Sequence, residues 1–105
     1  MAMDLCEKVY GLVRKLPTEE RFALGDQLRR AVVSIPSNIA EGNGRGTSKD
    51  YAHFLSMARG SLFEVRTQLE LAERLGYFTI SDKLAAQIES ISKMLFSMSR
   101  KLANQ

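Results

Sequence analysis

Apolar residues recur at steps of three and four positions along almost the whole chain, which is the period of an α-helix with one buried face. No segment shows the strict alternation that is typical of a half-buried β-strand. The clearest apolar stripe lies near the C-terminus and comprises Leu84, Ile88, Ile91, Leu95, Met98 and Leu102. Such an unbroken heptad pattern favours a helix that packs lengthwise against its neighbours in a bundle.

Residues that begin or end helices divide the chain into four helical segments. Threonine and serine side chains can accept hydrogen bonds from the free N–H groups of a first helical turn, whereas proline and glycine interrupt helices. The predicted boundaries are Pro17 after a short first helix, Thr18 as the cap of the second, the turn 42–46, Thr47 or Ser48 as the cap of the third, Gly76 at its end, and Ser81 as the cap of the fourth.

One proline falls inside the predicted second helix. Pro36 lacks an N–H group and clashes with the preceding turn, so the helix must end near Ser34 or continue with a kink. The apolar stripe persists to Ile39, and we therefore predict a continuous, kinked helix. Its expected apolar face comprises Phe22, Leu24, Leu28, Ala31, Val32, Ile35 and Ile39.

The length of 105 residues suits one domain, which we assign to residues 1–105. At about 1.5 Å per residue, the second and third helices would be about 40 Å long and the first only about 20 Å. The short helix cannot cover its neighbours, so self-association is expected. Further apolar side chains lie beside the main stripes and strengthen this expectation: Met57, Phe63, Phe78, Met94 and Phe96.

The composition excludes most metal, redox and enzymatic chemistry. A structural zinc site needs about four Cys or His ligands, and this chain has only Cys6 and His53. No nucleophile with a paired base and no phosphate-binding loop of the Walker type can be assembled. We therefore expect no enzymatic activity, no metal and no cofactor. A signal peptide and a membrane span are also not indicated, so a cytoplasmic protein is expected.

Basic residues exceed acidic residues by a formal charge of +3. Several charges are matched one helical turn apart and are predicted to form local pairs. These pairs are Asp4 with Lys8, Asp26 with Arg30, Arg66 with Glu70, Glu70 with Arg74, and Glu89 with Lys93. The basic residues that remain include Arg29, Arg45, Lys49 and Arg59 around the central turn and third helix, with Arg100 and Lys101 near the C-terminus.

The glycine-rich turn 42–46 has two interpretations. It precedes a helix N-terminus, where free N–H groups beside Arg45 and Lys49 can hold a phosphate. A tight connection between helices explains the same glycines and is favoured. Tyr51 and Phe54 follow the helical spacing, so they are interpreted as core residues rather than as platforms for bases.

Several segments together resemble the bacterial four-helix bundle family named for the protein encoded in intervening sequences of large-subunit ribosomal RNA genes. These segments are residues 26–42 (DQLRRAVVSIPSNIAEG), 44–51 (GRGTSKDY), 58–64 (ARGSLFE), 68–72 (QLELA) and 75–77 (LGY). The resemblance covers nearly the whole chain. It departs at the start, where the first helix looks shorter than is usual in the family.

The resemblance implies an all-α, antiparallel up-down four-helix bundle that assembles into a ring-like homopentamer. It also implies an association with RNA, which for the family rests largely on gene location, and no enzymatic activity. A related branch is the accessory protein of diversity-generating retroelements, a pentameric barrel that binds a reverse transcriptase and nucleic acid.

The signature around the proline carries polar side chains near the packed face. We expect them to satisfy backbone groups that Pro36 leaves free, or to pair with Arg59 between helices. The residues of this structural motif are Ser34, Pro36, Ser37, Asn38, Glu41 and Gly42.

Two functional hypotheses from different classes follow. The first is a non-enzymatic homo-oligomer that binds RNA or DNA through a basic surface made of Arg29, Arg30, Arg45, Lys49 and Arg59. The second is an interaction scaffold that docks another protein, such as a reverse transcriptase, and touches nucleic acid only through that partner. Neither hypothesis involves a membrane.

Overall fold

The computed structural model describes residues 1–105 and contains only α-helices. Four of them form a four-helix bundle, and the fifth is a single turn. The helices are α1 (Ala2–Val13), α2 (Thr18–Arg21), α3 (Leu24–Asn43), α4 (Ser48–Arg74) and α5 (Asp82–Ala103). The all-α bundle expected from the sequence is confirmed.

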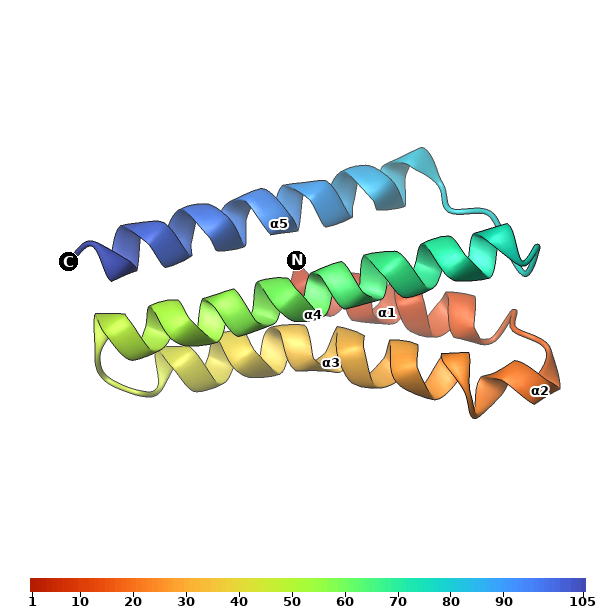
Figure 1. Cartoon of the computed structure of the whole chain (residues 1–105), viewed down its shortest axis with the longest axis horizontal. Helices are drawn as coiled ribbons and strands as arrows, with labels where there is room; N and C mark the ends of the chain where they lie inside the picture. The colour runs from red at the N-terminus through yellow and green to blue at the C-terminus, as the bar shows by residue number, and fades with distance from the viewer.

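The three long helices run along the long axis of a molecule that measures 46 × 25 × 18 Å (Figure 1). α4 lies between α3 and α5, and each of these helices is antiparallel to the next one in the chain. α1 has only 12 residues and covers one half of the bundle, so the N-terminus lies near the middle of its length. The other half of the bundle is built from α3, α4 and α5 alone.

Most of the predicted helix ends are confirmed. The Thr47 side chain accepts a hydrogen bond from the Asp50 N–H group at the start of α4. Ser81 caps α5 in the same way by accepting from the Leu84 N–H group. Gly76 follows α4 with a φ of +83°, a left-handed conformation that favours glycine after a helix.

The predicted start of the second helix is wrong. Thr18 is the first residue of the single turn α2 rather than its cap, and the chain breaks before α3 begins at Leu24. The break lets the first turn of α3 approach the end of α1 closely, because a Cβ atom on Gly25 would lie 3.2 Å from Val13 Cγ1. Phe22, which we predicted on the apolar face, falls in this break and is 80% exposed.

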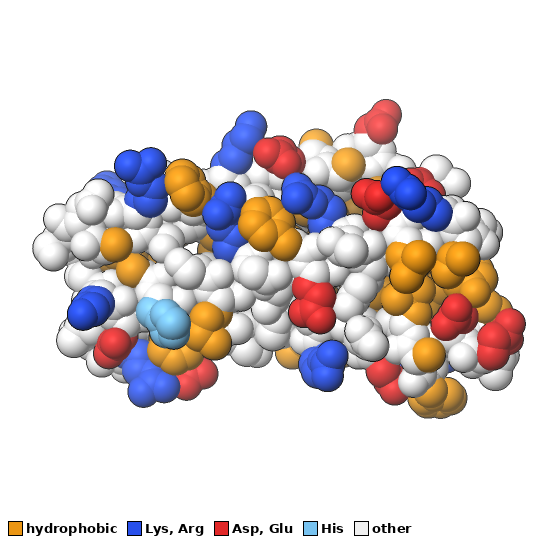
Figure 2. Space-filling view, in the orientation of Figure 1, with side chains coloured by type: hydrophobic (Ala, Val, Ile, Leu, Met, Phe, Trp, Pro, Cys, Tyr) orange, Lys and Arg blue, Asp and Glu red, His pale blue; other side chains and the backbone are white.

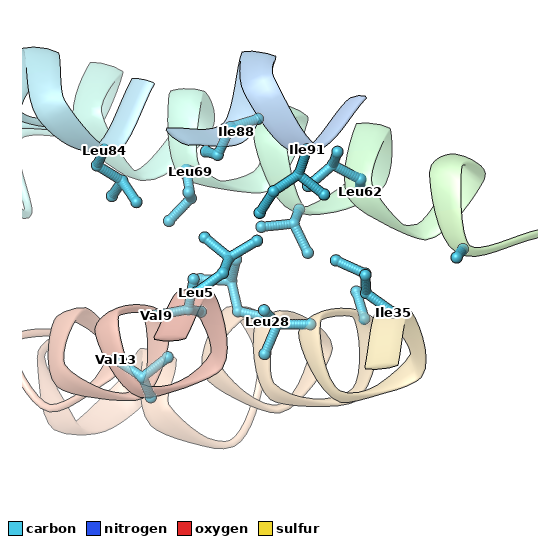
Figure 3. Close-up of a cluster of buried hydrophobic side chains, with 14 of the residues drawn as sticks. Leu5, Val9, Val13, Leu28, Ile35, Leu62, Leu69, Leu84, Ile88 and Ile91 are labelled. Atoms are coloured by element: carbon cyan, nitrogen blue, oxygen red, sulfur yellow. The ribbon is translucent and has the colours of Figure 1, made fainter. Parts of the chain in front are cut away.

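The apolar stripes of the four main helices meet in one core. Leu5 and Val9 of α1 point toward Leu28 of α3 and toward the side chains of α4 and α5, including Leu62 and Ile91 (Figure 3). The predicted residues Ile39, Met98 and Leu102 pack against this core but stay partly exposed, because they lie in the half that α1 does not reach. The fully buried core residues are Leu5, Val9, Leu28, Val32, Ile35, Leu55, Ala58, Leu62, Val65, Leu69, Ala72, Ile91 and Leu95.

α3 continues through Pro36, as predicted. A proline at position 36 leaves the carbonyl of Val32, one turn earlier, without its helical donor. The Cys6 thiol of α1 donates a hydrogen bond to this carbonyl, with a distance of 3.3 Å from Sγ to O. Burial, and then the Glu7 carboxylate, raise the pKa of the Cys6 thiol, so the thiol keeps the proton that it donates.

Of the five predicted local ion pairs, only Glu70 with Arg74 forms, at 2.9 Å. Arg66 and Glu89 pair with each other across α4 and α5 at 3.7 Å instead of with neighbours on their own helices. Packing of the two helices brings these side chains together, which spacing along one helix cannot reveal. None of the helices combines the length and the apolar character that a membrane span requires.

Candidate nucleic-acid interface

Arginine and phenylalanine side chains alternate along the groove between α4 and α5. The Arg59 guanidinium lies over two rings, 4.8 Å from the centre of Phe63 and 4.6 Å from the centre of Phe96. The Arg66 guanidinium lies 4.9 Å from the centre of Phe63, and that of Arg100 lies 5.6 Å from the centre of Phe96. We call these five side chains the arginine–phenylalanine row.

The helical period explains the row. Arg59, Phe63 and Arg66 are spaced by four and then three residues on α4, so they share one face of that helix. Phe96 and Arg100 are four residues apart on α5, which runs antiparallel beside α4. Each ring therefore lies between two guanidinium groups. Figure 2 shows blue and orange side chains alternating along this part of the surface, over α4 and α5.

Arg59 is the most enclosed cation of the row. Its Nε atom is buried and has no hydrogen-bond partner. The side chain of Arg66 is 51% exposed, and Arg100 is exposed. A guanidinium stacked on rings keeps its in-plane N–H donors free, and these donors match the oxygens of a phosphate.

The row borders an open hollow of about 340 Å³. The hydroxyl oxygens of Ser56 and Ser99 lie 2.9 Å apart in this hollow, and Ser99 also donates to the Ala52 carbonyl at 3.1 Å. The hollow contains no carboxylate. Its lining residues are Ser56, Arg59, Gly60, Phe63, Phe96, Ser99 and Arg100.

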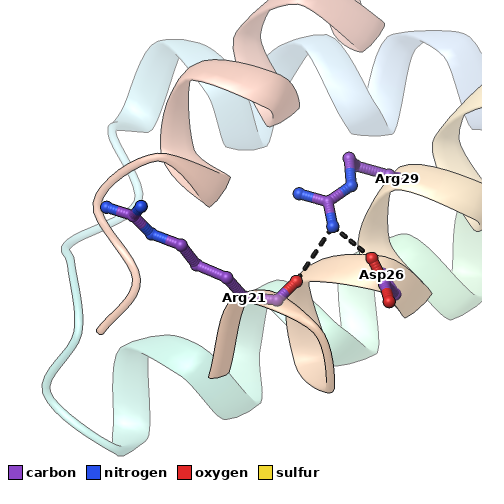
Figure 4. A network of polar contacts seen from close by, with 3 residues as sticks. All are labelled: Arg21, Asp26 and Arg29. Atoms are coloured by element: carbon purple, nitrogen blue, oxygen red, sulfur yellow. Dashed lines mark hydrogen bonds and ion pairs between the residues drawn. The ribbon is translucent and has the colours of Figure 1, made fainter. Parts of the chain in front are cut away.

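Arg29 is engaged in the local structure of the α2–α3 break. Its Nη2 atom donates to the Arg21 carbonyl at 2.9 Å and also contacts the Asp26 carboxylate (Figure 4). The carbonyl of Arg21 is one of the groups that a helix end leaves unpaired. The predicted partner of Asp26 was Arg30, but the break turns Arg29 toward this carboxylate instead.

The turn between α3 and α4 is a tight connection. A Cβ atom on Gly42 would lie 2.7 Å from Phe54 Cβ, so the two helices approach closely here. Arg45 pairs with Glu41 at 2.9 Å, and its guanidinium lies 4.9 Å from the centre of the Phe54 ring. Lys49 is exposed and forms no ion pair. A phosphate contact at this turn stays a prediction.

The five basic residues singled out from the sequence do not come together. Arg29 and Arg30 lie near the start of α3, whereas Arg45 and Lys49 lie at the opposite end of the bundle. The 16 residues from Arg29 to Arg45 correspond to about 24 Å of helix at about 1.5 Å per residue. Arg59 lies between these two groups along the length of α4.

The sequence reasoning missed the role of two members of the row. Arg66 was assigned to a local pair with Glu70, and Arg100 was only noted as an unpaired cation. The spacings of Arg66 and Arg100 from Phe63 and Phe96 were the available signal. That signal becomes specific only when α4 and α5 are known to be neighbours.

Polar side chains around Pro36 bond to the backbone of α3, but the prediction that they satisfy the carbonyl freed by the proline is wrong, because the Val32 carbonyl accepts from Cys6. Ser34 Oγ donates to the Ala31 carbonyl at 2.7 Å, and Asn38 Nδ2 donates to the Ser34 carbonyl at 2.8 Å. Ser37 is exposed, and no hydrogen bond of its side chain is found. The alternative of a contact with Arg59 is wrong, because Arg59 points into the groove between α4 and α5 and Glu41 pairs with Arg45.

No group of three or more His, Cys, Asp or Glu side chains is placed to hold a metal ion. The fold and the row define an all-α helix-bundle protein with arginines arranged along one surface groove. The chain belongs to the 23S rRNA-intervening sequence protein family, whose family model matches residues 1–97. This match confirms the family that the sequence segments indicated. Comparison with curated proteins gave no significant match.

Proposed function

We propose that this protein is a non-enzymatic, homo-oligomeric protein that binds RNA in the cytoplasm, with the arginine–phenylalanine row as its main contact. One observation carries the proposal: two phenyl rings hold three guanidinium groups in a single groove. The family description refers to 23S rRNA, which agrees with RNA as the polyanion.

Phosphate contacts of this kind give affinity without reading a sequence. Guanidinium groups displace the counterions that surround nucleic acid, so binding weakens as salt rises. Arg30 and Lys49 are exposed and form no ion pair, so they add to the positive field, whereas Asp26 and Glu41 offset the charges of Arg29 and Arg45. In a ring of five copies, the formal charge of +3 per chain becomes about +15, which attracts a polyanion over a longer range.

We expect the purified protein to bind structured and single-stranded RNA at low salt, with little preference for sequence. Three phosphate contacts per protomer predict that a fourfold rise in salt weakens binding by about 20- to 40-fold. Fluorescence anisotropy with labelled RNAs at two salt concentrations measures this effect. Absence of association at low salt would rule out the proposal.

A matched pair of variants assigns the binding to the row. Arg100→Gln removes an exposed cation of the row from α5, and Lys83→Gln removes an exposed cation from the first turn of the same helix. The first substitution is expected to weaken RNA binding and to reduce its salt dependence, and the second to leave both nearly unchanged. Equal effects of the two substitutions would show that net charge, and not the row, determines binding.

Self-association is supported by the uneven cover of the bundle. α1 protects only one half, and several large apolar side chains stay open to solvent. Met57 of α4, at 44%, and Phe96 of α5, at 43%, lie in the half that α1 does not reach, whereas Phe22 at 80%, Leu75 at 51% and Leu71 at 48% lie toward the other end of the bundle. Surfaces of this kind usually meet another subunit.

Light scattering is expected to give a molar mass that is a multiple of the 11.8 kDa chain, with five copies as the specific expectation. The measurement should be repeated at high salt, because burial of apolar surface is insensitive to screening whereas pairing of charges is not. A mass of one chain at both salt concentrations would contradict the proposal of an oligomer.

The exposed apolar side chains also favour a second candidate function, a scaffold that docks another protein such as a reverse transcriptase. Phe22 favours this alternative, because its phenyl ring is 80% exposed and is available to a partner protein. Arg59→Glu distinguishes the two functions, provided that light scattering shows an unchanged oligomer. Loss of RNA binding in this variant supports direct contact with RNA. Retained capture of the partner protein by the variant supports the scaffold.

A further inference from the structure

Each ring of the row already lies against two guanidinium groups, and only Phe96 is exposed, at 43%. Proteins that hold single strands through their bases usually offer open aromatic faces. Phe63 lies between the guanidiniums of Arg59 and Arg66, and Phe96 lies between those of Arg59 and Arg100. A base that stacks on either ring therefore competes with the arginines that already lie over it.

The Phe54 ring at the α3–α4 turn is also in contact with other side chains. The Arg45 guanidinium lies over the Phe54 ring, and the His53 ring meets the same ring edge-on with centres 5.9 Å apart. Tyr51 Cδ1 and Phe54 pack against Gly42. A base at this turn would therefore compete with Arg45 and His53 for the Phe54 ring.

The guanidinium of Arg59 contacts two rings, and its Nε atom is buried, so its terminal N–H groups are the donors left for a ligand. The remaining terminal N–H donors form the fork that matches phosphate oxygens. The only other polar side chains that line the hollow are Ser56, Ser99 and Arg100, so a base edge finds few partners.

The two rings also fix the spacing of the charges. Each phenyl ring lies within 4.6 to 5.6 Å of two guanidiniums, so the three positive charges follow one another along the groove. A polymer that carries one negative charge on each of its units can bind along such a row. Among the three arginines of the row, only Arg66 forms an ion pair, with the Glu89 carboxylate at 3.7 Å.

The geometry points to a site that binds a chain of phosphates as such. The row accepts the phosphodiester backbone of RNA and also inorganic polyphosphate, and bases contribute little to its affinity. This inference rests on the proposed function in placing RNA on the row. It goes further by naming the recognised chemical group and a second ligand, inorganic polyphosphate.

The test compares three competitors with equal numbers of phosphates: single-stranded RNA, an abasic sugar–phosphate chain, and inorganic polyphosphate. Each displaces a labelled RNA from the oligomer at one low salt concentration. We expect the three inhibition constants to agree within about threefold, because each ligand offers the same charge-assisted contacts. RNA that competes more than about tenfold better than both other chains, a difference of about 1.4 kcal/mol, would overturn the inference.

Variants of the row complete the test. Arg100→Gln is expected to weaken all three competitors alike by about tenfold, as loss of a hydrogen bond to a charged group predicts, while Lys83→Gln weakens none. Arg100 is exposed and contacts only the Phe96 ring at 5.6 Å, so its replacement should not disturb the fold. Arg59→Lys, checked by circular dichroism, should also weaken all three, because an ammonium group cannot fill the place between the rings with a planar fork.

The outcomes separate this inference from the proposed function. Direct binding of polyphosphate that depends on Arg100, without any binding of RNA, supports the phosphate site and rules out the RNA function. Tight binding of RNA without any binding of polyphosphate supports the RNA function and overturns the phosphate site.

Discussion

Pro36→Ala is expected to raise the free energy of unfolding. A proline in the interior of a helix costs about 3 kcal/mol relative to alanine, because it removes one hydrogen bond and crowds the preceding turn. The gain here should be smaller than that value, since the Cys6 thiol already supplies a donor to the Val32 carbonyl. Urea unfolding followed by circular dichroism measures the change. Ser37→Ala is the control, because this neighbouring side chain is exposed.

A double-mutant cycle tests the reason for this expectation. Cys6→Ala removes the thiol donor and should lower the free energy of unfolding by about 1 kcal/mol through the lost hydrogen bond, in addition to its lost packing. In the Pro36→Ala background, the new N–H group of residue 36 can serve the Val32 carbonyl, so the same substitution should cost less. Fully additive effects would show that the thiol does not compensate for the proline.

Gly42→Ala is expected to lower the free energy of unfolding by about 1 to 3 kcal/mol, the usual cost of inserting a methyl group into a well-packed contact. The new Cβ atom would lie 2.7 Å from Phe54 Cβ and 3.0 Å from Tyr51 Cδ1, so α3 and α4 would have to separate. The higher helix propensity of alanine, worth about 1 kcal/mol, offsets part of this loss.

Gly44→Ala is the matched control two residues further along the chain. Its Cβ atom would have no neighbour closer than 3.6 Å, and Gly44 has a φ of −84° that any residue adopts. This substitution should be neutral or slightly stabilising in the same urea titration. If Gly42→Ala behaved like the control, the close approach of α3 and α4 at this turn would be refuted.

The helical period predicts which face of each long helix is buried. Leu55, Leu62 and Leu69 recur at steps of seven residues on α4, and all three are fully buried. This success has a simple cause: a helix in the middle of a bundle must turn its apolar stripe toward the core. The caps at Thr47 and Ser81 were equally predictable, because their hydrogen bonds involve only residues close in sequence.

The break before α3 was not predictable in the same way. Nothing in the local sequence from Thr18 to Gly25 forbids a continuous helix, and Phe22 even fits its apolar stripe. The break coincides with the close approach of Gly25 to Val13 at the end of α1, which is a contact between different elements. Local propensity cannot anticipate a boundary that tertiary packing sets.

The site was predictable only in part. Arg59 was identified as a basic residue without a local acid, and it is the central cation of the row. Arg66 was assigned to Glu70 because spacing along one helix cannot show that Glu89 of α5 lies closer. Recognition of the whole row requires the register of α5 against α4, and this register depends on how the two apolar stripes fit together.

The row has a consequence for how its binding can be regulated. All three of its cations are arginines, and a guanidinium group stays protonated over the whole range of acidity that living cells experience. The only histidine, His53, lies outside the row beside Phe54. If the row binds phosphates as proposed, its attraction for them is therefore adjusted by the concentrations of competing ions rather than by a change of charge on its own side chains.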